Sequence, residues 1–396
     1  MRNEPSGMSA PPTSHKPRPV ITLLYVVTED WYFWSHRKDL ACAAREAGYR
    51  VLLATRCGAH RARIEALGIV CFDLPFERSL RHPLRDLRLL FALNALIGRE
   101  RPALVHLVAL KPIVLSALAV LTRRKARFVH ALTGMGYLFS SGDGLARRLR
   151  RIVRPLLRGL LSRANSHAIV QNDDDLRLLA ALGVSPAKAS LIPGAGVDLA
   201  RYTPQPAPSA GPLLVVLPAR MLRDKGVAEF LAAAPTVRAG LPTVRLALVG
   251  GLDADNPAAY TQAALTAAAA AAGVEWWGQR DDMREVYAAA SLVCLPSYRE
   301  GLPKALLEAA ACARPLLATD VPGCRDICRD GVSGVLVPPR DAAALATAML
   351  ALLADAPRRD VLAAGARQLV EREFSSERVH AATLDLYARL LAPVVA

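Results

Sequence analysis

Aromatic side chains are scarce in this sequence, and its cysteines lack the spacing of metal ligands. Phe, Trp and Tyr make up 5% of the 396 residues, and the seven cysteines include no C-x-x-C pair. The shortage of aromatics argues against an all-β sandwich. The odd number of cysteines, mostly inside apolar runs, favours buried reduced thiols over disulfides or a zinc site.

Long uninterrupted apolar runs are also missing. The longest, residues 103–121, contains His106, Lys111 and Pro112, which disfavours a membrane-spanning helix. Residues 1–19 are rich in Pro and Ser without an apolar core, so they predict a disordered leader and no signal peptide. We expect a cytoplasmic protein that is at most peripheral to a membrane.

Positive charge is plentiful and unevenly spread. The sequence is 53% hydrophobic, which excludes a disordered chain, and its length predicts two domains. Lys and Arg number 50 against 35 Asp and Glu, and residues 78–163 carry 18 cations and three acids, so the whole surplus of 15 lies there. Such a surplus is typical of proteins that bind nucleic acid, an anionic membrane surface or phosphorylated ligands.

Short apolar runs alternate with helical patterns in the first half. Residues 20–27 and 50–55 flank a helical pattern at 35–47, and similar apolar runs occur at 103–107, 127–131 and 167–171. Continuous apolar strands separated by helices predict an α/β fold with a doubly wound parallel sheet buried on both faces.

The segment T-P-Q-P-A-P-S-A-G-P, residues 203–212, interrupts this alternation because four prolines and a glycine sustain neither helix nor central strand. We therefore predict domains at 20–205 and 213–375, with a final helix at 376–396 that packs back on the first domain. The alternation restarts in the second half with expected strands at 213–217, 244–249, 274, 291–295 and 315–318, and expected helices at 225–239, up to 272, 303–313, 341–353 and 357–374. Two such domains in tandem would leave a cleft at the carboxyl ends of both sheets, where these sheets bind ligands.

The densest chemical signal is S-Y-R-E-G-L-P-K-A-L-L-E at 297–308. Glu300, Gly301 and Leu302 precede an expected helix that starts at Pro303, so their free amides predict an anion site. Glu308 lies more than a turn into that helix, where a carboxylate suits sugar or ribose hydroxyls. For either glutamate taken alone, the favoured interpretation is structural: a first-turn helix carboxylate for Glu300 and a solvated carboxylate for Glu308.

A second signal, P-A-R-M-L-R-D-K-G at 218–226, follows an expected strand directly. Arg220 and Lys225 would lie on the strand-to-helix turn and could bind a diphosphate by charge-assisted hydrogen bonds. Asp224 is the expected N-cap of the helix. Solvated surface cations remain the alternative interpretation.

Taken together, these motifs resemble the retaining nucleotide-sugar glycosyltransferases of family 4, which have the GT-B fold of two facing Rossmann-like domains. The resemblance covers the chain from about residue 20 to its end. Within the family, the sequence is similar to the bacterial subgroup that extends lipid-linked oligosaccharides for surface polysaccharides. Further segments that carry it are E-D-W-Y-F-W-S-H-R (29–37), T-G-M-G-Y-L-F (133–139), Q-N-D-D-D (171–175), I-P-G-A-G-V-D (192–198), V-P-G-C-R-D-I (321–327) and G-V-S-G-V-L-V-P-P (331–339).

The resemblance implies a catalytic group of Arg220, Lys225 and Glu300. The two cations would bind the donor diphosphate and stabilise the charge that grows on it, while Glu300 would bind hydroxyls of the transferred sugar. Amides of Gly301 and Leu302 would assist them.

Two further donor contacts are implied by the same resemblance. Glu308 would bind the ribose hydroxyls, and residues 276–280 would hold the base. Transfer in the family is thought to proceed by front-face attack, with a phosphate oxygen taking the acceptor's proton, so no protein nucleophile is needed.

For the acceptor side we predict His36, His130, Thr133 and Gly134. A lone histidine that ends an apolar strand, as His130 does, is more often structural, and the same alternative applies to His36.

Two other motifs we interpret as structural. The D-x-D at 253–255 follows two glycines and is expected to cap a helix, so we predict no metal. The spacing Gly134-Met135-Gly136 lacks the third glycine of a dinucleotide fingerprint, so we predict no cofactor beyond the nucleotide-sugar co-substrate.

Residues 145–163 carry the most concentrated basic pattern. Leucines and Ile152 fall on one helical face and five arginines on another, with Pro155 expected to kink the helix. We predict that this segment binds an anionic membrane surface; a packed surface helix is the alternative.

The function we predict is a retaining transfer of a hexose or N-acetylhexosamine from a UDP-linked donor to a polyprenyl-diphosphate-linked sugar, at the inner face of the cytoplasmic membrane. The first alternative is a GT-B enzyme with a soluble acceptor. The second is a basic nucleic-acid-binding protein, which the absence of a recognition motif disfavours.

Overall fold

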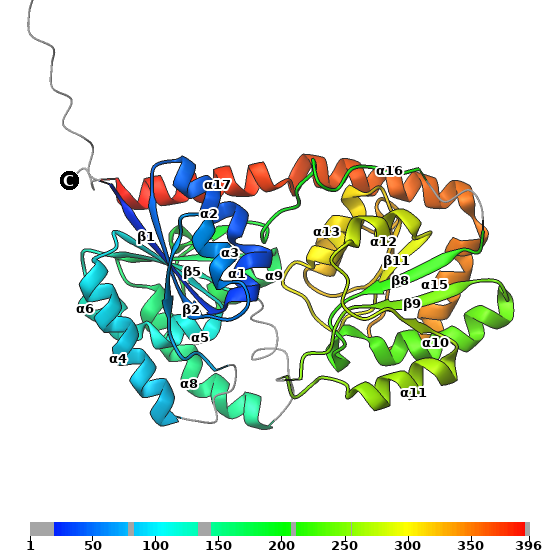
Figure 1. Ribbon diagram of the computed structural model, residues 1–396, viewed down its shortest axis with the longest axis horizontal. Helices are drawn as coiled ribbons and strands as arrows, with labels where there is room; N and C mark the ends of the chain where they lie inside the picture. The colour runs from blue at the N-terminus through cyan, green and yellow to red at the C-terminus, as the bar shows by residue number, and fades with distance from the viewer. Residues whose placement is uncertain (1–19, 78–82, 134–143, 207–210, 255, 393–396) are drawn as a thin grey trace, which may run out of the picture.

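The protein consists of two parallel β-sheets, each covered by helices, that lie side by side (Figure 1). The computed structural model describes residues 20–77, 83–133, 144–206, 211–254 and 256–392. We refer to the first sheet with its helices as the first domain and to the second as the second domain.

The first sheet has seven strands in the order β3-β2-β1-β4-β5-β6-β7, and every neighbouring pair is parallel. Its strands are β1 (Thr22–Glu29), β2 (Arg50–Arg56), β3 (Val70–Asp73), β4 (Leu104–Val108), β5 (Arg127–Ala131), β6 (Ser166–Val170) and β7 (Ala189–Leu191). Its helices are α1 (Asp30–His36), α2 (Lys38–Glu46), α3 (Arg61–Ala66), α4 (Pro83–Glu100), α5 (Leu110–Leu115), α6 (Ala117–Thr122), α8 (Gly144–Leu161) and α9 (Asp173–Ala181), with a 3-10 turn η1 (Pro186–Lys188). The order reverses between β1 and β4, and such a switch point opens a crevice at the carboxyl ends of the strands.

The second sheet repeats this plan with six parallel strands in the order β10-β9-β8-β11-β12-β13. Its strands are β8 (Leu214–Pro218), β9 (Arg245–Val249), β10 (Glu275–Trp276), β11 (Leu292–Leu295), β12 (Leu316–Thr319) and β13 (Gly334–Val337). Its helical segments are η2 (Arg223–Lys225), α10 (Val227–Gly240), α11 (Gln262–Ala272), α12 (Met283–Ala289), α13 (Lys304–Ala311), α14 (Cys324–Ile327), α15 (Ala342–Ala354) and α16 (Ala356–Glu373).

The central strands are buried along their whole length because helices cover both faces of each sheet. All residues of β4, β6 and β8 are buried, as parallel sheets between two helical layers require. The predicted fold class, two doubly wound domains that face a cleft, is confirmed.

One predicted helix, 35–47, is two helices in the structure. Asp30–His36 forms α1 and Lys38–Glu46 forms α2, and the chain turns between them at Arg37, whose φ is −129°. The Arg37 side chain is buried and donates to the Gly194 carbonyl at 3.3 Å. The break between α1 and α2 therefore coincides with a contact to a distant segment. Helical periodicity alone does not predict such a break.

The last helix, α17 (Ser376–Leu391), returns to the first domain (Figure 1). Its Val379, Leu386 and Tyr387 belong to the hydrophobic core between β1 and α2. The Tyr387 hydroxyl lies 2.5 Å from His106 Nδ1 and 3.2 Å from the Tyr25 hydroxyl. The first domain is thus built from two separate parts of the chain.

The basic helix predicted to lie in a membrane interface is α8, and part of that prediction is wrong. The helix runs through Pro155 without interruption. Leu157, Leu160 and Leu161 are at most 2% exposed and pack in the core of the first domain. The apolar face of this half is therefore occupied by the domain itself and is not free to enter lipid. Of the helices in the described segments, none is long and apolar enough to cross a bilayer.

Candidate active site

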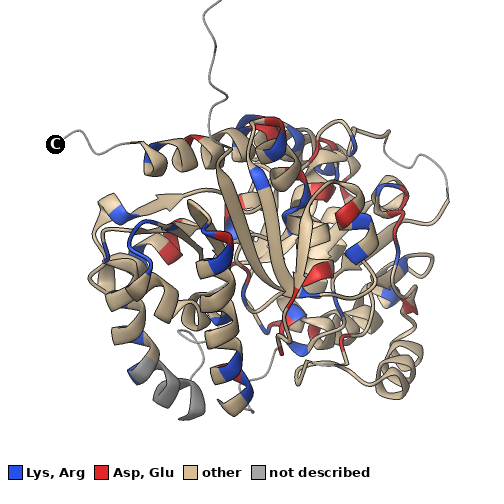
Figure 2. Cartoon of the chain, turned by 60° about the vertical axis from the view of Figure 1, so that its left-hand side comes forward, with Lys and Arg blue, Asp and Glu red and all other residues tan. Residues whose placement is uncertain are grey.

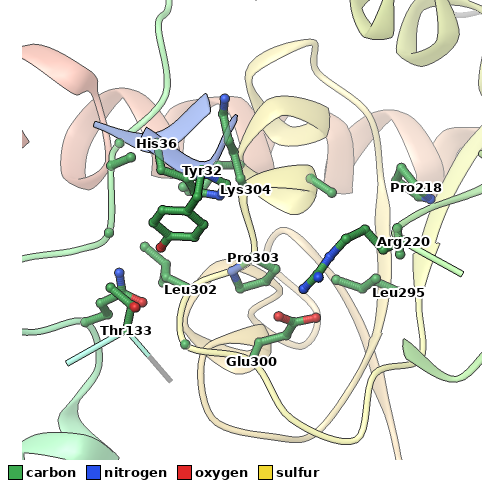
Figure 3. Close-up of a pocket in the computed structure, with 18 of the residues that line it drawn as sticks. Tyr32, His36, Thr133, Pro218, Arg220, Leu295, Glu300, Leu302, Pro303 and Lys304 are labelled. Atoms are coloured by element: carbon green, nitrogen blue, oxygen red, sulfur yellow. The ribbon is translucent and has the colours of Figure 1, made fainter. Parts of the chain in front are cut away.

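A cavity of about 300 Å³ lies between the carboxyl ends of the two sheets (Figure 3). Its lining combines α1 and the 194–196 loop with the turns after β8 and β11. The lining residues that the structure describes include four cations, Arg37, Arg220, Lys225 and Lys304, and one carboxylate, Glu300. This excess of positive charge favours a ligand with several negative charges.

Lys225 reaches the cavity from a tight turn rather than from the start of a helix. Its backbone belongs to η2, and α10 begins after Gly226, so Asp224 is not the helix N-cap that the sequence predicts. Gly226 has a φ of +70°, and a Cβ there would lie 2.0 Å from the Pro296 carbonyl oxygen. Only glycine fits this crossing of the two turns, which brings Lys225 Nζ to 2.6 Å from Glu300 Oε1.

Arg220 lies on the turn that follows β8 and is held in place by two neighbours. It forms an ion pair with Asp253, and its guanidinium lies 5.8 Å from the centre of the Trp31 ring of the other domain. In Figure 3 the side chains of Arg220 and Glu300 point toward one another. Since Lys225 is bonded to Glu300 as well, the two cations predicted to bind phosphate, Arg220 and Lys225, lie at the same end of the cavity.

Glu300, Gly301 and Leu302 all line the cavity on the loop between β11 and α13. The Ser297 hydroxyl donates to Glu300 Oε1 at 2.7 Å, and Asn172 of the first domain donates from its amide to the Gly301 carbonyl at 2.8 Å. These bonds fix the loop from both domains.

Glu308 lies behind the cavity wall and does not belong to its lining. It is 7% exposed, and its carboxylate accepts hydrogen bonds from Tyr202 at 2.9 Å and Tyr287 at 3.1 Å. Burial and the Glu308 carboxylate raise the pKa of both tyrosines, so both remain donors. A third partner, the Lys304 ammonium, lies 3.4 Å from Glu308 Oε1 and lines the cavity. Binding of ribose hydroxyls by Glu308 stays a prediction.

On the acceptor side, His36 lines the cavity together with Tyr32 and Thr133. The imidazole stacks on the Tyr32 ring at 4.3 Å, and its Nδ1 lies 2.5 Å from the Ser35 hydroxyl. Burial, followed by the nearby cations Lys304 and Arg37, lowers the pKa of His36 to about 3. His36 is therefore a neutral imidazole at pH 7.

His130 does not line the cavity, contrary to the sequence-based prediction. It is fully buried within β5, and its Nε2 lies 3.0 Å from the Ser166 hydroxyl. Its place inside the sheet explains the error, because the strand continues past it to Ala131. Gly134, the other acceptor-side candidate in this region, lies outside the described residues.

The segment 276–280, predicted to hold the base, borders a separate hollow of about 350 Å³ with Trp277 and Arg280 in its wall. The Trp276 indole donates to the Gly250 carbonyl at 3.0 Å, and Arg280 pairs with Asp282. Base binding by this segment remains a prediction.

The D-x-D segment does not cap the helix that follows. The N-cap of α11 is Thr261, whose hydroxyl accepts from the Ala264 amide, while Asp253 pairs with Arg220. Asp255 is outside the described residues. Throughout the described ranges, no group of three or more His, Cys, Asp or Glu side chains is placed to hold a metal ion.

Sequence reasoning missed Lys304, Arg37 and Gln171, all of which line the cavity. Lys304 Nζ donates to the Ser35 carbonyl of the first domain at 2.8 Å. A cation in the first turn of α13 opposes the helix dipole, and this was the available signal. Arg37 and Gln171 lie within the segments 29–37 and 171–175 that carry the family resemblance, which was the available signal for them.

Two family models match this chain. Residues 34–195 match the glycosyl transferase 4-like domain, and residues 212–355 match glycosyl transferases group 1. The two matches coincide with the first and second domains.

Individual relatives match to different extents. The chain is 24% identical over 341 residues to the N,N'-diacetylbacillosaminyl-diphospho-undecaprenol alpha-1,3-N-acetylgalactosaminyltransferase of Campylobacter jejuni, covering 83% of this chain and 88% of that protein. It is 44% identical over 112 residues to the D-inositol 3-phosphate glycosyltransferase of Salinispora tropica, a match that spans 28% of this chain and about a quarter, 23%, of that protein.

Among solved structures, Anabaena HepE in complex with UDP-glucose has a TM-score of 0.75 at 19% identity, covering 93% of this chain and all of that one, 100%. The likeness at this level of identity concerns the fold, which is that of the GT-B enzymes.

Proposed function

We propose that this GT-B glycosyltransferase moves a hexosyl or N-acetylhexosaminyl group from a UDP-linked donor to a lipid-linked sugar. The observation that carries the proposal is the cavity between the domains, whose lining holds four cations and one carboxylate. UDP is chosen as the nucleotide because HepE, which shares the fold, is described in complex with UDP-glucose.

The donor diphosphate would take the position between Arg220 and Lys225. In the structure, each of these cations has a carboxylate partner, Asp253 and Glu300 respectively. A diphosphate carries more negative charge than a carboxylate and offers more acceptor oxygens, so it would displace Glu300 from Lys225. The freed Glu300 carboxylate would then accept from hydroxyls of the transferred sugar.

Bond cleavage would proceed with retention at the anomeric carbon. The bond from that carbon to the donor phosphate oxygen breaks while a bond to the acceptor oxygen forms on the same face. The acceptor's proton passes to the departing diphosphate, whose growing charge Arg220 and Lys225 stabilise. His36, neutral at pH 7, would orient the acceptor by hydrogen bonding rather than by charge.

A lipid-linked acceptor is favoured by the Campylobacter relative, whose name specifies an undecaprenol diphosphate and whose match spans most of both chains. The Salinispora relative favours a soluble acceptor instead, since its name specifies inositol 3-phosphate. Its match covers only 112 residues, so we place this second candidate behind the first.

A donor screen tests the proposal. We expect UDP or a UDP-sugar to raise the melting temperature of the protein and to be hydrolysed slowly without acceptor. Lys225→Ala should lower kcat/KM about a hundredfold or more, as loss of one charge-stabilising group does.

The matched control is Arg223→Ala. Arg223 lies in the same turn η2 but is exposed, contacts Tyr260 and does not line the cavity. Equal loss of activity in both variants, or no nucleotide-dependent stabilisation, would contradict the proposed site. Polyprenyl-diphosphate sugar and inositol phosphate, supplied in parallel, distinguish the two acceptor classes.

A further inference from the structure

A second basic cavity lies at the opposite edge of the first sheet from the active site. It measures about 700 Å³ and is bounded by the ends of α4 and α6 and by the segments that lead into β4 and β5. Its lining includes four cations and no carboxylate: Arg101, Arg123, Arg124 and Lys125. None of these four forms an ion pair with any carboxylate in the described segments of the chain.

Helix ends do not account for this charge. Cations near the C-termini of α4 and α6 are favourable, because each helix end carries about half a negative elementary charge. The two helix ends together supply about one negative charge, which is too little to balance four cations. The nearest acid in the sequence, Glu100, is already paired with Arg50 and Arg99. The pocket therefore keeps a surplus that suits an anionic ligand.

The geometry of Arg123 indicates a site rather than scattered surface charge. Its guanidinium lies close to α4 at Gly98, where an added Cβ would come within 2.6 Å of it. Its Nε is buried and has no hydrogen-bond partner. Gly98 thus makes room for a cation at the wall of the cavity.

An exposed apolar stripe lies on α4, the helix whose C-terminal end borders this pocket. Leu84, Leu87 and Phe91 recur along the outer face of α4 and are 74%, 50% and 56% exposed, and Leu121 at the end of α6 is 48% exposed. Thr122 Oγ1 lies 3.4 Å from Asn94 Oδ1, which joins the end of α6 to the middle of α4. The opposite face of α4 already supplies Leu89, Leu93, Leu96 and Ile97 to the core, so the outer stripe is surplus to folding.

We propose that this pocket binds the phosphate of an anionic phospholipid and that the α4 stripe lies against the bilayer beside it. Apolar side chains flanked by cations match the interface of an anionic membrane, where each cation adds to binding. A free phosphate would use the four cations but would leave the apolar stripe without a role.

The direction of α4 relates this surface to the active site. The helix follows β3 and precedes β4, so it runs from the carboxyl edge of the sheet, which faces the cleft, to the opposite edge, where the pocket lies. Figure 2 turns this side forward and shows blue Lys and Arg positions along its helices. A bilayer along α4 would also lie near the cleft, where a lipid-linked acceptor would enter. Membrane binding by α4 depends on the proposed function only through the lipid-linked acceptor.

The test is sedimentation with vesicles of phosphatidylcholine alone or with one third phosphatidylglycerol. We expect the full-length protein to bind the anionic vesicles at least tenfold better, and less well as salt rises. Arg124→Glu with Lys125→Glu should reduce that binding at least tenfold, and Leu87→Ser with Phe91→Ser should also reduce it. The control pair Arg358→Glu with Arg378→Glu, exposed on α16 and α17, should leave binding unchanged.

Three outcomes would overturn the inference. The protein could bind both vesicle types equally or not at all. The charge variant could lose affinity for inorganic phosphate by calorimetry while its vesicle binding stays intact, which would identify a site for soluble phosphate. The apolar variant could alter self-association in sedimentation velocity instead of vesicle binding, which would make the stripe a contact between two copies. Donor hydrolysis, measured on the same variants, reports separately on the proposed function.

Discussion

At the residue scale, the structure divides the residues predicted to bind the donor into those that line the cavity and one that does not. Arg220, Lys225 and Glu300 line it, and their motifs predicted this closeness because each follows a strand, and the carboxyl ends of parallel strands meet at one edge. Glu308 illustrates the limit of that reasoning. Its spacing from Pro303 indicated a helix position but not which face of the helix the tyrosines cover.

Replacing Glu308 by Ala should lower the free energy of unfolding by about 2–4 kcal/mol, because two buried tyrosine hydroxyls lose their acceptor. The measurement is urea denaturation. In a background with Tyr202→Phe and Tyr287→Phe the same change should cost less than half as much. If Glu308→Ala lowered the free energy of unfolding equally in both backgrounds, the hydrogen bonds from the tyrosines to this carboxylate would not contribute to stability. UDP affinity of the same variants tests its predicted role toward ribose.

The buried His130 should make stability depend on pH. Burial lowers the pKa of His130 to about 3 in the folded protein, whereas an unfolded chain has a histidine pKa of about 6.5. Below pH 6.5 the unfolded state therefore binds a proton that the folded state does not, and stability falls as the pH falls toward 3. At pH 5 this amounts to about 2 kcal/mol.

Urea titrations at pH 7 and pH 5 provide the measurement. The loss of stability between these two values should be smaller by about 2 kcal/mol in His130→Asn than in the parent protein. His106 and His167, whose pKa values burial also lowers, would account for part of the slope that remains. An identical slope in the variant would mean that His130 titrates normally in the folded state.

At the scale of elements, long periodic segments were predictable and short edge segments were not. The closing helices, expected at 341–353, 357–374 and within 376–396, are Ala342–Ala354, Ala356–Glu373 and Ser376–Leu391. The four-residue strands β3 and β13 were missed because each lies at or near a sheet edge and is too short to show a period. The tight turn η2 was merged with α10 because nothing before Gly226 in the sequence indicates that the helix has yet to begin.

That turn yields a prediction about how the fold positions Lys225. Gly226→Ala should cost more than about 2 kcal/mol, since alanine is strained at a φ of +70° and its Cβ would collide with the Pro296 carbonyl. Donor affinity should fall with stability because Lys225 is the preceding residue. Gly159→Ala is the control. Gly159 lies within α8 with open space around it, so alanine there should raise stability by up to about 1 kcal/mol.

At the scale of the whole molecule, the two domains are joined where the chain crosses between them twice. The Val197 amide donates to the Phe374 carbonyl, and the Ser376 amide donates back to the Val197 carbonyl, both at 2.9 Å. Gly196 permits this approach, since a Cβ there would lie 2.7 Å from Ser376 Cα. Composition predicted two domains and a break near 203–212, but no sequence signal indicated that the two crossings bond to each other.

The returning helix should contribute directly to the stability of the first domain. Leu386→Ala removes a side chain that is 1% exposed in that domain's core and should cost about 2–5 kcal/mol. Chemical denaturation followed by circular dichroism measures the loss. The neighbouring exposed Asp385→Ala should change stability by less than about 0.5 kcal/mol. A small effect of Leu386→Ala would mean that α17 is only loosely attached.

The return of α17 also bears on the order in which the protein is made. Domains of nascent chains generally fold as units while the ribosome is still adding residues. Here the first domain cannot complete its core until Val379, Leu386 and Tyr387 leave the exit tunnel, whereas the second domain, which ends with α16, is already whole by then. The domain that is synthesised first is thus the last to be finished.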